Sequence, residues 1–460
     1  MVWIKKVKGK IPVAITIAGS DSGGGAGIQA DLKTFAALGV HGTTALTSIT
    51  AQNTCSVIGV EDVNTEMIRK QIKTVAEDIG IDAGKTGMLH TQGIINAVAS
   101  EISKYKFPLV VDPVMIAKSG AALLEPDAVN ALKEHLLPKA TVVTPNKFEA
   151  ERLAKVRIRN MEDAEIAAKK ISKIGPEAVI VKGGHIDQQG AVDVLYYMGE
   201  FRVFKAPKLD VKTTHGTGCS FSAAIAAELA KGKNIPEAVE NAKKLVTLAI
   251  RFGLNLGEGY GPVNPMAYLY RESSKYQVLS NMEEAKRLLE SSPLVAKLVP
   301  EVGMNIAMAI PYAEKVGDIV AIPGRLVKVP EGARSVAHPR FGGSSHLATY
   351  ILEIMKHDPI RKAAINLKFS EGILEILKAM NLKLSFYDRR EEPEEVKKLE
   401  GMTVPWGVTQ AVKRLGKAPD VIYHKGDFGK EPMIVIFGKE ATELAELVLK
   451  IAAKVGDHGS

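Results

Sequence analysis

Cysteine and aromatic residues are scarce in this chain. Among 460 residues there are two cysteines, Cys55 and Cys219, and two tryptophans, and aromatic residues make up only 5% of the sequence. Two cysteines are too few for a disulfide framework, and they lack the paired spacing of a zinc site. The sequence therefore excludes a fold held by disulfides and a cysteine-bound structural metal, and we expect both thiols to be reduced.

Long apolar segments are missing as well. No apolar run approaches the roughly 20 residues that a membrane-spanning helix needs. Residues 1–10 also lack the hydrophobic centre of a signal peptide. We therefore expect a cytoplasmic protein with no membrane partner.

Charge of one sign does not gather in any block of the sequence. The 60 lysines and arginines exceed the 52 acidic residues and give a net charge of +8, but both signs are interspersed throughout the chain. Nucleic-acid-binding proteins usually cluster their basic residues. We expect phosphorylated small-molecule substrates and no nucleic acid as partner, and a homo-oligomer whose number of subunits the sequence leaves open.

What the sequence does contain is a regular alternation of strand-like and helix-like segments. It predicts a parallel sheet with helices on both faces, with strands at residues 12–18, 43–50, 83–89, 109–112, 140–144 and 178–182. Residues 192–205 instead predict a β-hairpin. Since the length exceeds a single core, we predict an α/β domain over residues 1–265, a linker over 266–278 and a smaller α/β domain over 279–460.

A tight turn that opens a helix lies at residues 213–220. Gly216, Thr217 and Gly218 precede an alanine-rich run, so unpaired N–H groups and the positive end of the helix dipole face whatever lies before the turn. Anions bind at such places. Cys219 lies in the first helical turn, where the dipole is expected to lower its thiol pKa. The alternative is a plain helix start in which Cys219 packs as a small hydrophobic residue.

Polar residues close three of the predicted strands. Asp112, Asn146 and Lys182 lie at these positions, and ligands of parallel sheets gather outside the carboxyl ends of the strands. The first strand runs into a glycine-rich loop at residues 19–27, which matches neither the P-loop nor the dinucleotide-binding spacing. We therefore expect a ligand site at this edge of the sheet.

A second segment of similar character precedes a predicted helix near the C-terminus. Residues 334–346 combine basic and hydroxyl side chains with glycine, and they include Gly342, Gly343, Ser344 and Ser345. The segment predicts a phosphate or pyrophosphate site that uses the same helix-terminus physics. The alternative is a solvated connection in which Ser344 or Ser345 only caps the helix.

The first domain resembles the hydroxymethylpyrimidine and phosphomethylpyrimidine kinase family of thiamine biosynthesis. The segments that carry the resemblance are residues 18–34, 51–54, 85–89, 111–115, 144–149, 182–185 and 215–219. The resemblance implies a ribokinase-like three-layer α/β/α fold. It also implies two ATP-dependent phosphorylations, first of 4-amino-5-hydroxymethyl-2-methylpyrimidine and then of its monophosphate. A kinase of a pyridoxal-type vitamer is the alternative.

The resemblance further implies roles for the matching residues. A pyrimidine pocket is expected from Gly19, Asp31, Gln52, Met88 and Val114, in which an amide and a carboxylate pair with the ring nitrogens and the amino group. Taken without the family, Gln52 is an ordinary loop residue and Met88 a core residue.

For phosphoryl transfer the resemblance implies positioning groups, a metal and a base. Mg²⁺ is expected at Asp112 and Glu149, the nucleotide phosphates at Lys182 and Asn146, and the transferred group at the N–H groups of Gly216, Thr217 and Gly218. Cys219 stands where related sugar kinases carry a catalytic aspartate. It is expected to deprotonate the alcohol in the first phosphorylation, whereas the already ionised phosphate of the second needs no base.

The second domain resembles the thiamine-phosphate synthase domain found fused behind this kinase, chiefly in archaea. Residues 323–325, 341–346, 388–390 and 424–429 carry the match. It implies that pyrimidine diphosphate is coupled to thiazole phosphate with release of pyrophosphate. Arg325 and His346 are expected to assist the departing pyrophosphate, and Arg389 and His424 are secondary candidates. The alternative is a sensor that binds thiamine phosphate without catalysis.

Overall fold

The chain forms two compact units, Met1–Leu269 and Tyr270–Ser460, named the first and second unit below. The structure is a computed structural model that describes residues 11–116, 120–183, 190–399, 401–427 and 431–457. The expected linker at 266–278 is helical, because α9 (Met266–Ser273) and α10 (Lys275–Glu290) run through it. Within the described ranges no helix combines the length and the apolar character needed to cross a bilayer.

The first unit is built on a nine-stranded sheet with the order β3-β2-β1-β4-β5-β6-β7-β8-β9. Neighbouring strands from β2 to β7 run parallel, as the buried apolar runs predicted. The predicted hairpin is β8–β9, and the antiparallel edge strand β3 was not predicted because most of its side chains are exposed. The strands are β1 (Val13–Asp21), β2 (His41–Gln52), β3 (Val57–Asp62), β4 (Ala83–Thr86), β5 (Leu109–Val111), β6 (Val142–Val143), β7 (Ala178–Val181), β8 (Ala191–Tyr197) and β9 (Glu200–Ala206).

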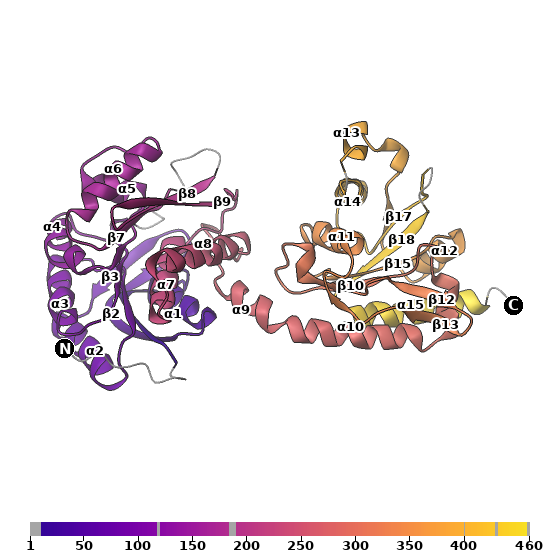
Figure 1. Cartoon of the computed structure of the whole chain (residues 1–460), viewed down its shortest axis with the longest axis horizontal. Helices are drawn as coiled ribbons and strands as arrows, with labels where there is room; N and C mark the ends of the chain where they lie inside the picture. Colours follow the sequence, from indigo (N-terminus) through magenta and orange to yellow (C-terminus); the bar gives the residue numbers. More distant parts are fainter. Residues whose placement is uncertain (1–10, 117–119, 184–189, 400, 428–430, 458–460) are drawn as a thin grey trace. The chain divides into compact units, whose positions relative to one another are not determined.

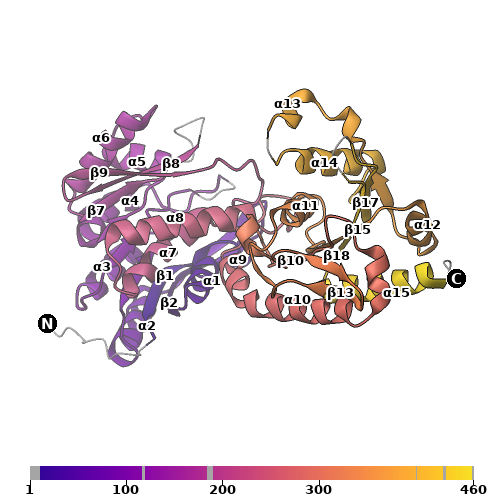
Figure 2. The same cartoon turned by 45° about the vertical axis from the view of Figure 1, so that its right-hand side comes forward.

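Helices cover both faces of this sheet, which confirms the three-layer α/β/α fold (Figures 1 and 2). One core lies between the sheet and α1, α7 and α8, and the other lies between the sheet and α2 to α6. Both cores consist largely of alanine, valine, isoleucine and leucine side chains. The helices are α1 (Gly27–Ala37), α2 (Thr65–Asp78), α3 (Gln92–Ile102), α4 (Ala128–Ala131), α5 (Lys147–Ala154), α6 (Met161–Ser172), α7 (Thr217–Ala230) and α8 (Ile235–Arg251).

The start of α7 is locked against the glycine-rich loop that follows β1. Gly216 has a φ of 79°, in the left-handed region that favours glycine. A Cβ atom at this position would lie 1.8 Å from the carbonyl oxygen of Gly25. Only glycine therefore lets the two loops meet, and their meeting places the N-terminus of α7 at the carboxyl edge of the sheet.

The second unit contains a seven-stranded sheet with the order β14-β11-β10-β15-β18-β17-β16 and a separate hairpin, β12–β13. Only β16 and β17 pair in parallel, so this unit is a mixed α/β fold. The strands are β10 (Ile306–Ala309), β11 (Ile319–Ala321), β12 (Leu326–Val329), β13 (Gly332–Ser335), β14 (Arg340–Phe341), β15 (Ala363–Lys368), β16 (Leu384–Phe386), β17 (Val421–His424) and β18 (Met433–Gly438).

Helices again lie on two sides of the sheet, with α11 packing on α14 and α10 packing on α15 (Figure 1). Helix α11 follows residues 334–346, where the sequence predicted a helix, whereas Pro405 and Gly407 interrupt the helical signal of α14. A single apolar core joins the sheet to its helices. The helices after α10 are α11 (Ser345–Met355), α12 (Glu371–Ala379), α13 (Glu394–Lys397), α14 (Thr403–Leu415) and α15 (Ala441–Asp457).

Candidate active sites

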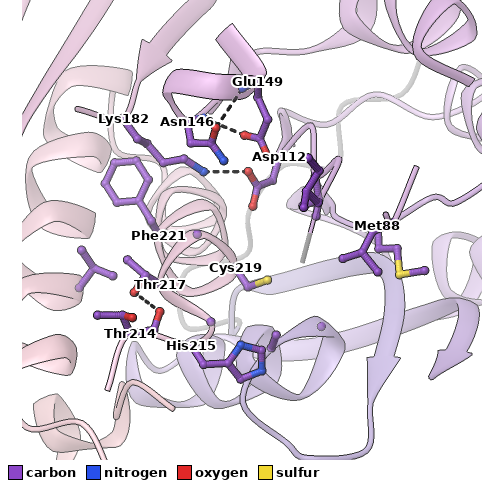
Figure 3. A pocket seen from close by; sticks show the side chains of 18 of the residues that line it. Met88, Asp112, Asn146, Glu149, Lys182, Thr214, His215, Thr217, Cys219 and Phe221 are labelled. Carbon is purple, nitrogen blue, oxygen red and sulfur yellow. Dashed lines mark hydrogen bonds and ion pairs between the residues drawn. The ribbon is translucent and has the colours of Figure 1, made fainter. Parts of the chain in front are cut away.

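A cavity of about 820 Å³ opens at the carboxyl edge of the first sheet, a size typical of small-molecule sites. Its lining includes most of the residues that we predicted for the pyrimidine and the phosphates: Gly19, Gln52, Met88, Val114, Asp112, Asn146, Glu149, Lys182, Gly216, Thr217, Gly218 and Cys219. Figure 3 shows Met88 on one side, the Lys182 and Asp112 group on another, and Cys219 between them. The structure thus brings the two predicted sets together in one cavity.

Asp31, which we expected to contact the pyrimidine, is instead fully buried beneath this cavity. Its Oδ2 atom accepts hydrogen bonds from Lys85 Nζ at 2.7 Å and from Thr16 Oγ1 at 2.6 Å. Lys85 lines the cavity in its place, although its side chain is fully shielded from solvent. Lys85 was not predicted as a site residue, although a lysine inside an otherwise apolar, buried strand was an available signal.

The buried Lys85–Asp31 pair is a stability determinant of the first unit. Replacing Lys85 by methionine is expected to lower the free energy of unfolding by about 3–5 kcal/mol, because it leaves the Asp31 carboxylate buried without a counterion. The double variant Lys85→Met with Asp31→Asn is expected to recover most of this loss. Calorimetric unfolding of the full chain measures both effects.

The matched control for this pair is Lys73→Met. Lys73 is exposed and lies 4.0 Å from Glu77, so its loss is expected to change the free energy of unfolding by less than about 1 kcal/mol. Additive losses from Lys85→Met and Asp31→Asn would show that the two side chains do not stabilise one another.

Asp21 organises the glycine-rich loop and was not predicted as a site residue. Its carboxylate accepts the N–H groups of Gly23 at 2.8 Å, Gly25 at 3.0 Å and Ala26 at 2.7 Å. It also accepts a hydrogen bond from His215 Nε2 at 2.9 Å. Burial raises the pKa of Asp21, but these hydrogen bonds outweigh burial and hold the pKa below its usual value. The ionised carboxylate therefore fixes the loop.

His215 connects this loop to the pyrimidine pocket. Its Nε2 atom lies 3.4 Å from the side-chain nitrogen of Gln52, and both residues line the cavity. His215 directly precedes the glycine turn, and the spacing of the sequence does not indicate that its side chain belongs to the site. It was therefore missed for lack of a local signal.

Helix α7 begins at Thr217, in the glycine turn where the sequence predicted a helix start. No side chain caps its N-terminus. The first helical bond runs from the Ser220 N–H to the Gly216 carbonyl at 2.9 Å. The Thr217 N–H donates to the Thr214 carbonyl at 3.4 Å, a long hydrogen bond, and its binding of the transferred group stays a prediction. Gly218 and Cys219 have no helical partner for their N–H groups, as in the first turn of any helix.

The prediction that the helix dipole lowers the pKa of Cys219 is wrong. Burial raises the pKa of the Cys219 thiol to about 11, against a smaller lowering by the Lys85 ammonium, and Asp31 and Asp112 raise it further. The reason is that two nearby carboxylates and the loss of water outweigh the helix terminus. At neutral pH the resting side chain is a thiol, half-buried at the cavity wall.

Lys182 and two carboxylates form the charged side of the cavity. Lys182 Nζ lies 2.9 Å from Asp112 Oδ1, which also accepts a hydrogen bond from Thr144 Oγ1 at 3.1 Å (Figure 3). Burial raises the pKa of Glu149 to about 7, while Lys182 lowers this pKa and Asp112 raises it. Glu149 therefore takes up a proton more readily than an ordinary glutamate.

Asn146 and Glu149 also cap helix α5. Glu149 Oε2 accepts the Asn146 N–H at 2.7 Å, and Asn146 Oδ1 accepts the Glu149 N–H at 3.0 Å. The described residues contain no group of three or more His, Cys, Asp or Glu side chains that could hold a metal. The two carboxylates Asp112 and Glu149 nevertheless suit Mg²⁺, which is commonly held by one or two carboxylates together with substrate phosphates.

A second cavity, of about 390 Å³, lies in the second unit. Its lining contains the predicted pyrophosphate-site residues Arg325, Gly342, Gly343, Ser344, Ser345 and His346, but not the secondary candidates Arg389 and His424. Ser344 is the N-cap of α11 but makes no side-chain cap hydrogen bond. A mere capping role is therefore not supported, and the N–H groups of the first turn lie at this cavity.

The backbone around this second cavity is tightly constrained. Arg325 has a φ of 74°, a left-handed conformation that is uncommon for a non-glycine residue. Its guanidinium donates to the Val302 carbonyl. A Cβ atom on Gly343 would lie 2.2 Å from the Ala321 carbonyl oxygen. These constraints hold the arginine and the glycine turn in fixed positions.

The secondary candidates Arg389 and His424 are both largely buried. They lie close enough to each other for the Arg389 charge to affect the titration of His424. Four residues of the family motifs, Gly184, His185, Phe428 and Gly429, lie outside the described residues.

Comparison with protein families divides the chain in the same way as the structure. Residues 21–264 match the model of the family described as phosphomethylpyrimidine kinase. Residues 281–450 match the family described as thiamine-phosphate synthase ThiN. Each match falls within one of the two compact units.

Individual relatives extend these matches. A bifunctional thiamine biosynthesis protein, ThiDN, of Methanocaldococcus jannaschii is 33% identical over 440 residues, covering 95% of this chain and 97% of that protein. The hydroxymethylpyrimidine/phosphomethylpyrimidine kinase of Bacillus subtilis is 48% identical and covers 55% of this chain and 95% of that protein.

Solved structures match the first unit. The ADP complex of Bacillus subtilis pyridoxal kinase is 44% identical, with a TM-score of 0.53, and covers 55% of this chain and 97% of that chain. The pyridoxal kinase of Staphylococcus aureus with AMP-PCP and pyridoxal is 40% identical, with a TM-score of 0.53, and covers 56% of this chain and 95% of that chain. These neighbours have the ribokinase-like fold expected from the sequence.

Proposed function

Since the chain belongs to the bifunctional thiamine-biosynthesis family that joins a phosphomethylpyrimidine kinase to a thiamine-phosphate synthase, we propose a role for each of its two cavities. The chain phosphorylates hydroxymethylpyrimidine and then its monophosphate, and it couples the resulting diphosphate to thiazole phosphate. The relative that matches 95% of the chain is a thiamine biosynthesis protein. This favours these activities over a pyridoxal-type kinase and over a non-catalytic sensor.

The kinase reactions take place in the cavity of the first unit. The observation that carries this proposal is the position of Cys219, which lies between the pyrimidine-pocket residues and the Lys182–Asp112 pair (Figure 3). Phosphoryl transfer depends mainly on positioning and charge neutralisation. A pyrimidine held at Gln52 and Met88 has its hydroxymethyl group directed toward the sulfur and toward the phosphates.

The phosphoryl donor ATP binds on the charged and apolar side of the same cavity. Lys182 contacts the phosphates, and Pro207, Leu209, Val246 and Ile250 supply apolar surface for the base. The Gly218 and Cys219 N–H groups at the start of α7 stabilise the transferred phosphoryl group. These assignments extend the coarser finding that kinases related to this chain bind nucleotide analogues.

Asp112 and Glu149 are the residues that would hold Mg²⁺. When bound, the ion neutralises phosphate charge during transfer. Burial raises the pKa of Glu149 to about 7, so in the absence of a cation this carboxyl group is about half protonated at neutral pH. Asp112 meanwhile keeps the Lys182 ammonium within 2.9 Å and so orients it toward the phosphates.

The synthase reaction takes place in the cavity of the second unit. In this reaction the bond between the pyrimidine methylene carbon and the diphosphate oxygen breaks, and the electron pair leaves with pyrophosphate. The thiazole nitrogen then forms the new bond to the carbon. Arg325, His346 and the N–H groups at Ser344 and Ser345 stabilise the departing charge, as donors at a helix N-terminus do.

A separation-of-function experiment tests the division between the cavities. The variant Lys182→Met is expected to lose at least about 100-fold in both phosphorylations and to make no detectable thiamine phosphate from the pyrimidine alcohol. Supplied with the pyrimidine diphosphate and thiazole phosphate, it is expected to couple them at the wild-type rate. Thiamine phosphate is measured by fluorescence after oxidation to thiochrome phosphate.

Lys173→Met serves as the control, because Lys173 is an exposed lysine of the same unit. It is expected to retain all three activities. Loss of coupling in Lys182→Met would contradict separate sites, and retention of both phosphorylations would contradict the role of Lys182.

A further inference from the structure

The carboxyl ends of four strands meet at one edge of the second sheet. Strand β16 is parallel to β17, and antiparallel pairs connect β17 to β18, β18 to β15, β15 to β10 and β10 to β11. Strands β11, β15, β16 and β17 therefore all point the same way. Arg325 follows β11, Arg389 follows β16, and His424 is the last residue of β17, so these three side chains belong to the same edge.

Hydrogen bonds connect the loop after β17 to the Arg325 site. Arg325 donates to the carbonyl of Val302, and the Val302 N–H donates to the carboxylate of Glu431 at 3.1 Å. The neighbouring Glu301 N–H donates to the other oxygen of Glu431 at 2.8 Å. Glu431, which precedes β18, therefore contacts the segment next to Arg325.

A chain of aromatic contacts places His346 between the two groups. The His346 ring meets the Tyr350 ring edge-on at 5.3 Å, and the hydroxyl groups of Tyr350 and Tyr387 lie 2.7 Å apart. The Tyr387 ring in turn lies 5.1 Å from the His424 ring. His346 thus lines the Arg325 cavity while its neighbours lead directly to His424.

Arg389 carries a hydrogen-bond donor that no described residue of the protein accepts. Its Nε atom is buried and has no hydrogen-bond partner among the described residues. Its ion-pair partner Glu392 is 3.8 Å away and already accepts a hydrogen bond from Thr403 at 2.6 Å. A buried guanidinium N–H without an acceptor is unfavourable. The Arg389 side chain as a whole is 17% exposed, although its Nε atom is buried.

His424 provides a second hydrogen-bond donor close to Arg389, whose charge contributes to a positive electrostatic potential at this place. Its Nδ1 atom accepts the Gly426 N–H at 3.2 Å, so in the neutral ring the proton is on Nε2, which is a donor. Burial, with smaller contributions from the nearby Arg389 charge and from His346, lowers the pKa of His424 to about 4. His424 is therefore neutral near pH 7, and an anion at this place would offset the positive charge of Arg389.

We infer that Arg389 and His424 form a second anion subsite in the second unit, which binds the phosphate monoester of the thiazole substrate. The inference rests on the proposed synthase function, whose two substrates are both anionic. The turn at Gly342 and Gly343 with Arg325 takes the diphosphate, and the Arg389 subsite takes the monophosphate. The reacting methylene and thiazole nitrogen then meet beside His346, between the two anions.

Steady-state kinetics of the full chain test the subsite. Arg389→Gln is expected to raise the KM for thiazole phosphate at least about tenfold, while the KM for pyrimidine diphosphate and both kinase rates stay within about twofold. Arg390→Gln is the matched control, because the neighbouring Arg390 is 81% exposed and pairs with Asp388. It is expected to leave both KM values unchanged. A rise in the KM for pyrimidine diphosphate, or none in that for thiazole phosphate, overturns the assignment.

A binding measurement separates this inference from the synthase function itself. Titration calorimetry compares thiazole phosphate with the thiazole alcohol, which lacks the phosphate. The wild type is expected to bind the phosphate at least about tenfold more tightly, and Arg389→Gln and His424→Gln are expected to lose most of this preference while still binding the alcohol. Equal preferences in the wild type and Arg389→Gln refute the subsite even if no variant couples the substrates. A wild type that binds but makes no thiamine phosphate refutes the synthase function instead.

Discussion

Cys219→Ala is expected to slow the first phosphorylation by about 10²–10⁴-fold, the usual contribution of a positioned general base, and to change the second by less than about threefold. The first step must remove a proton from an alcohol, whereas the nucleophile of the second step is a phosphate that is already ionised. Cys219 is half-buried at the wall of the cavity, where its sulfur points toward the side on which Met88 lies (Figure 3). Separate assays with the alcohol and with its monophosphate measure the two rates.

The pH dependence of the wild type is a further consequence of the same assignment. Burial raises the pKa of Cys219 to about 11, so the thiolate is a minor species that increases about tenfold for each pH unit below this value. The rate of the first phosphorylation is therefore expected to rise with pH between about 7 and 10, and the second is expected to lack this rise. In Cys219→Ala the rise should disappear.

Cys55→Ala is the natural control, because Cys55 is the other cysteine of the chain and is exposed. It is expected to leave both rates and both pH profiles unchanged. Equal losses of the two phosphorylations in Cys219→Ala would show that the residue positions substrates and is not the base.

The layered fold of the first unit could be predicted because its signals are local. The fully buried strand β1 appears in the sequence as an apolar run, and the hairpin β8–β9 as two β-rich runs around Gly199. Strand β3 has no such signal, since it pairs at an edge with most of its side chains in solvent. Helix α14 was not predicted for a different reason. Pro405 and Gly407 have low helix propensity and weaken its signal in the sequence, whereas tertiary packing maintains the helix in the fold.

The candidate sites were predicted as sets of positions more successfully than as chemical states. Gly216 and Gly343 could be identified from glycine turns before helices, because a glycine in the sequence directly indicates a backbone position that a side chain would not fit. The titration of Cys219 depends instead on Lys85, Asp31 and Asp112, which come from other strands and helices. Asp31 was predicted to line the pyrimidine pocket, but its partner Lys85 lines the cavity. The sequence does not show that these two residues pair, and only the packed structure decides which of them faces the cavity.

His346→Ala is expected to lower the rate of thiamine phosphate formation by about 10²–10³-fold, as for the removal of one donor to a developing charge, and to leave both kinase steps unchanged. His346 lines the cavity of the second unit together with Arg325, whereas the kinase residues line the cavity of the first. Supplied with the pyrimidine alcohol, ATP and thiazole phosphate, the variant is expected to accumulate pyrimidine diphosphate. Anion-exchange chromatography of the reaction mixture measures this intermediate.

His338→Ala distinguishes this effect from a general loss of histidine in the same unit. His338 lies in the same segment before α11, but its side chain is 85% exposed and lies 3.1 Å from Glu283. It is expected to couple the substrates at the wild-type rate and to accumulate no intermediate. A normal coupling rate in His346→Ala would remove His346 from the reaction. A loss of coupling without accumulation of the diphosphate would mean that the substitution also impairs the kinase, and the independence of the two cavities would then have to be abandoned.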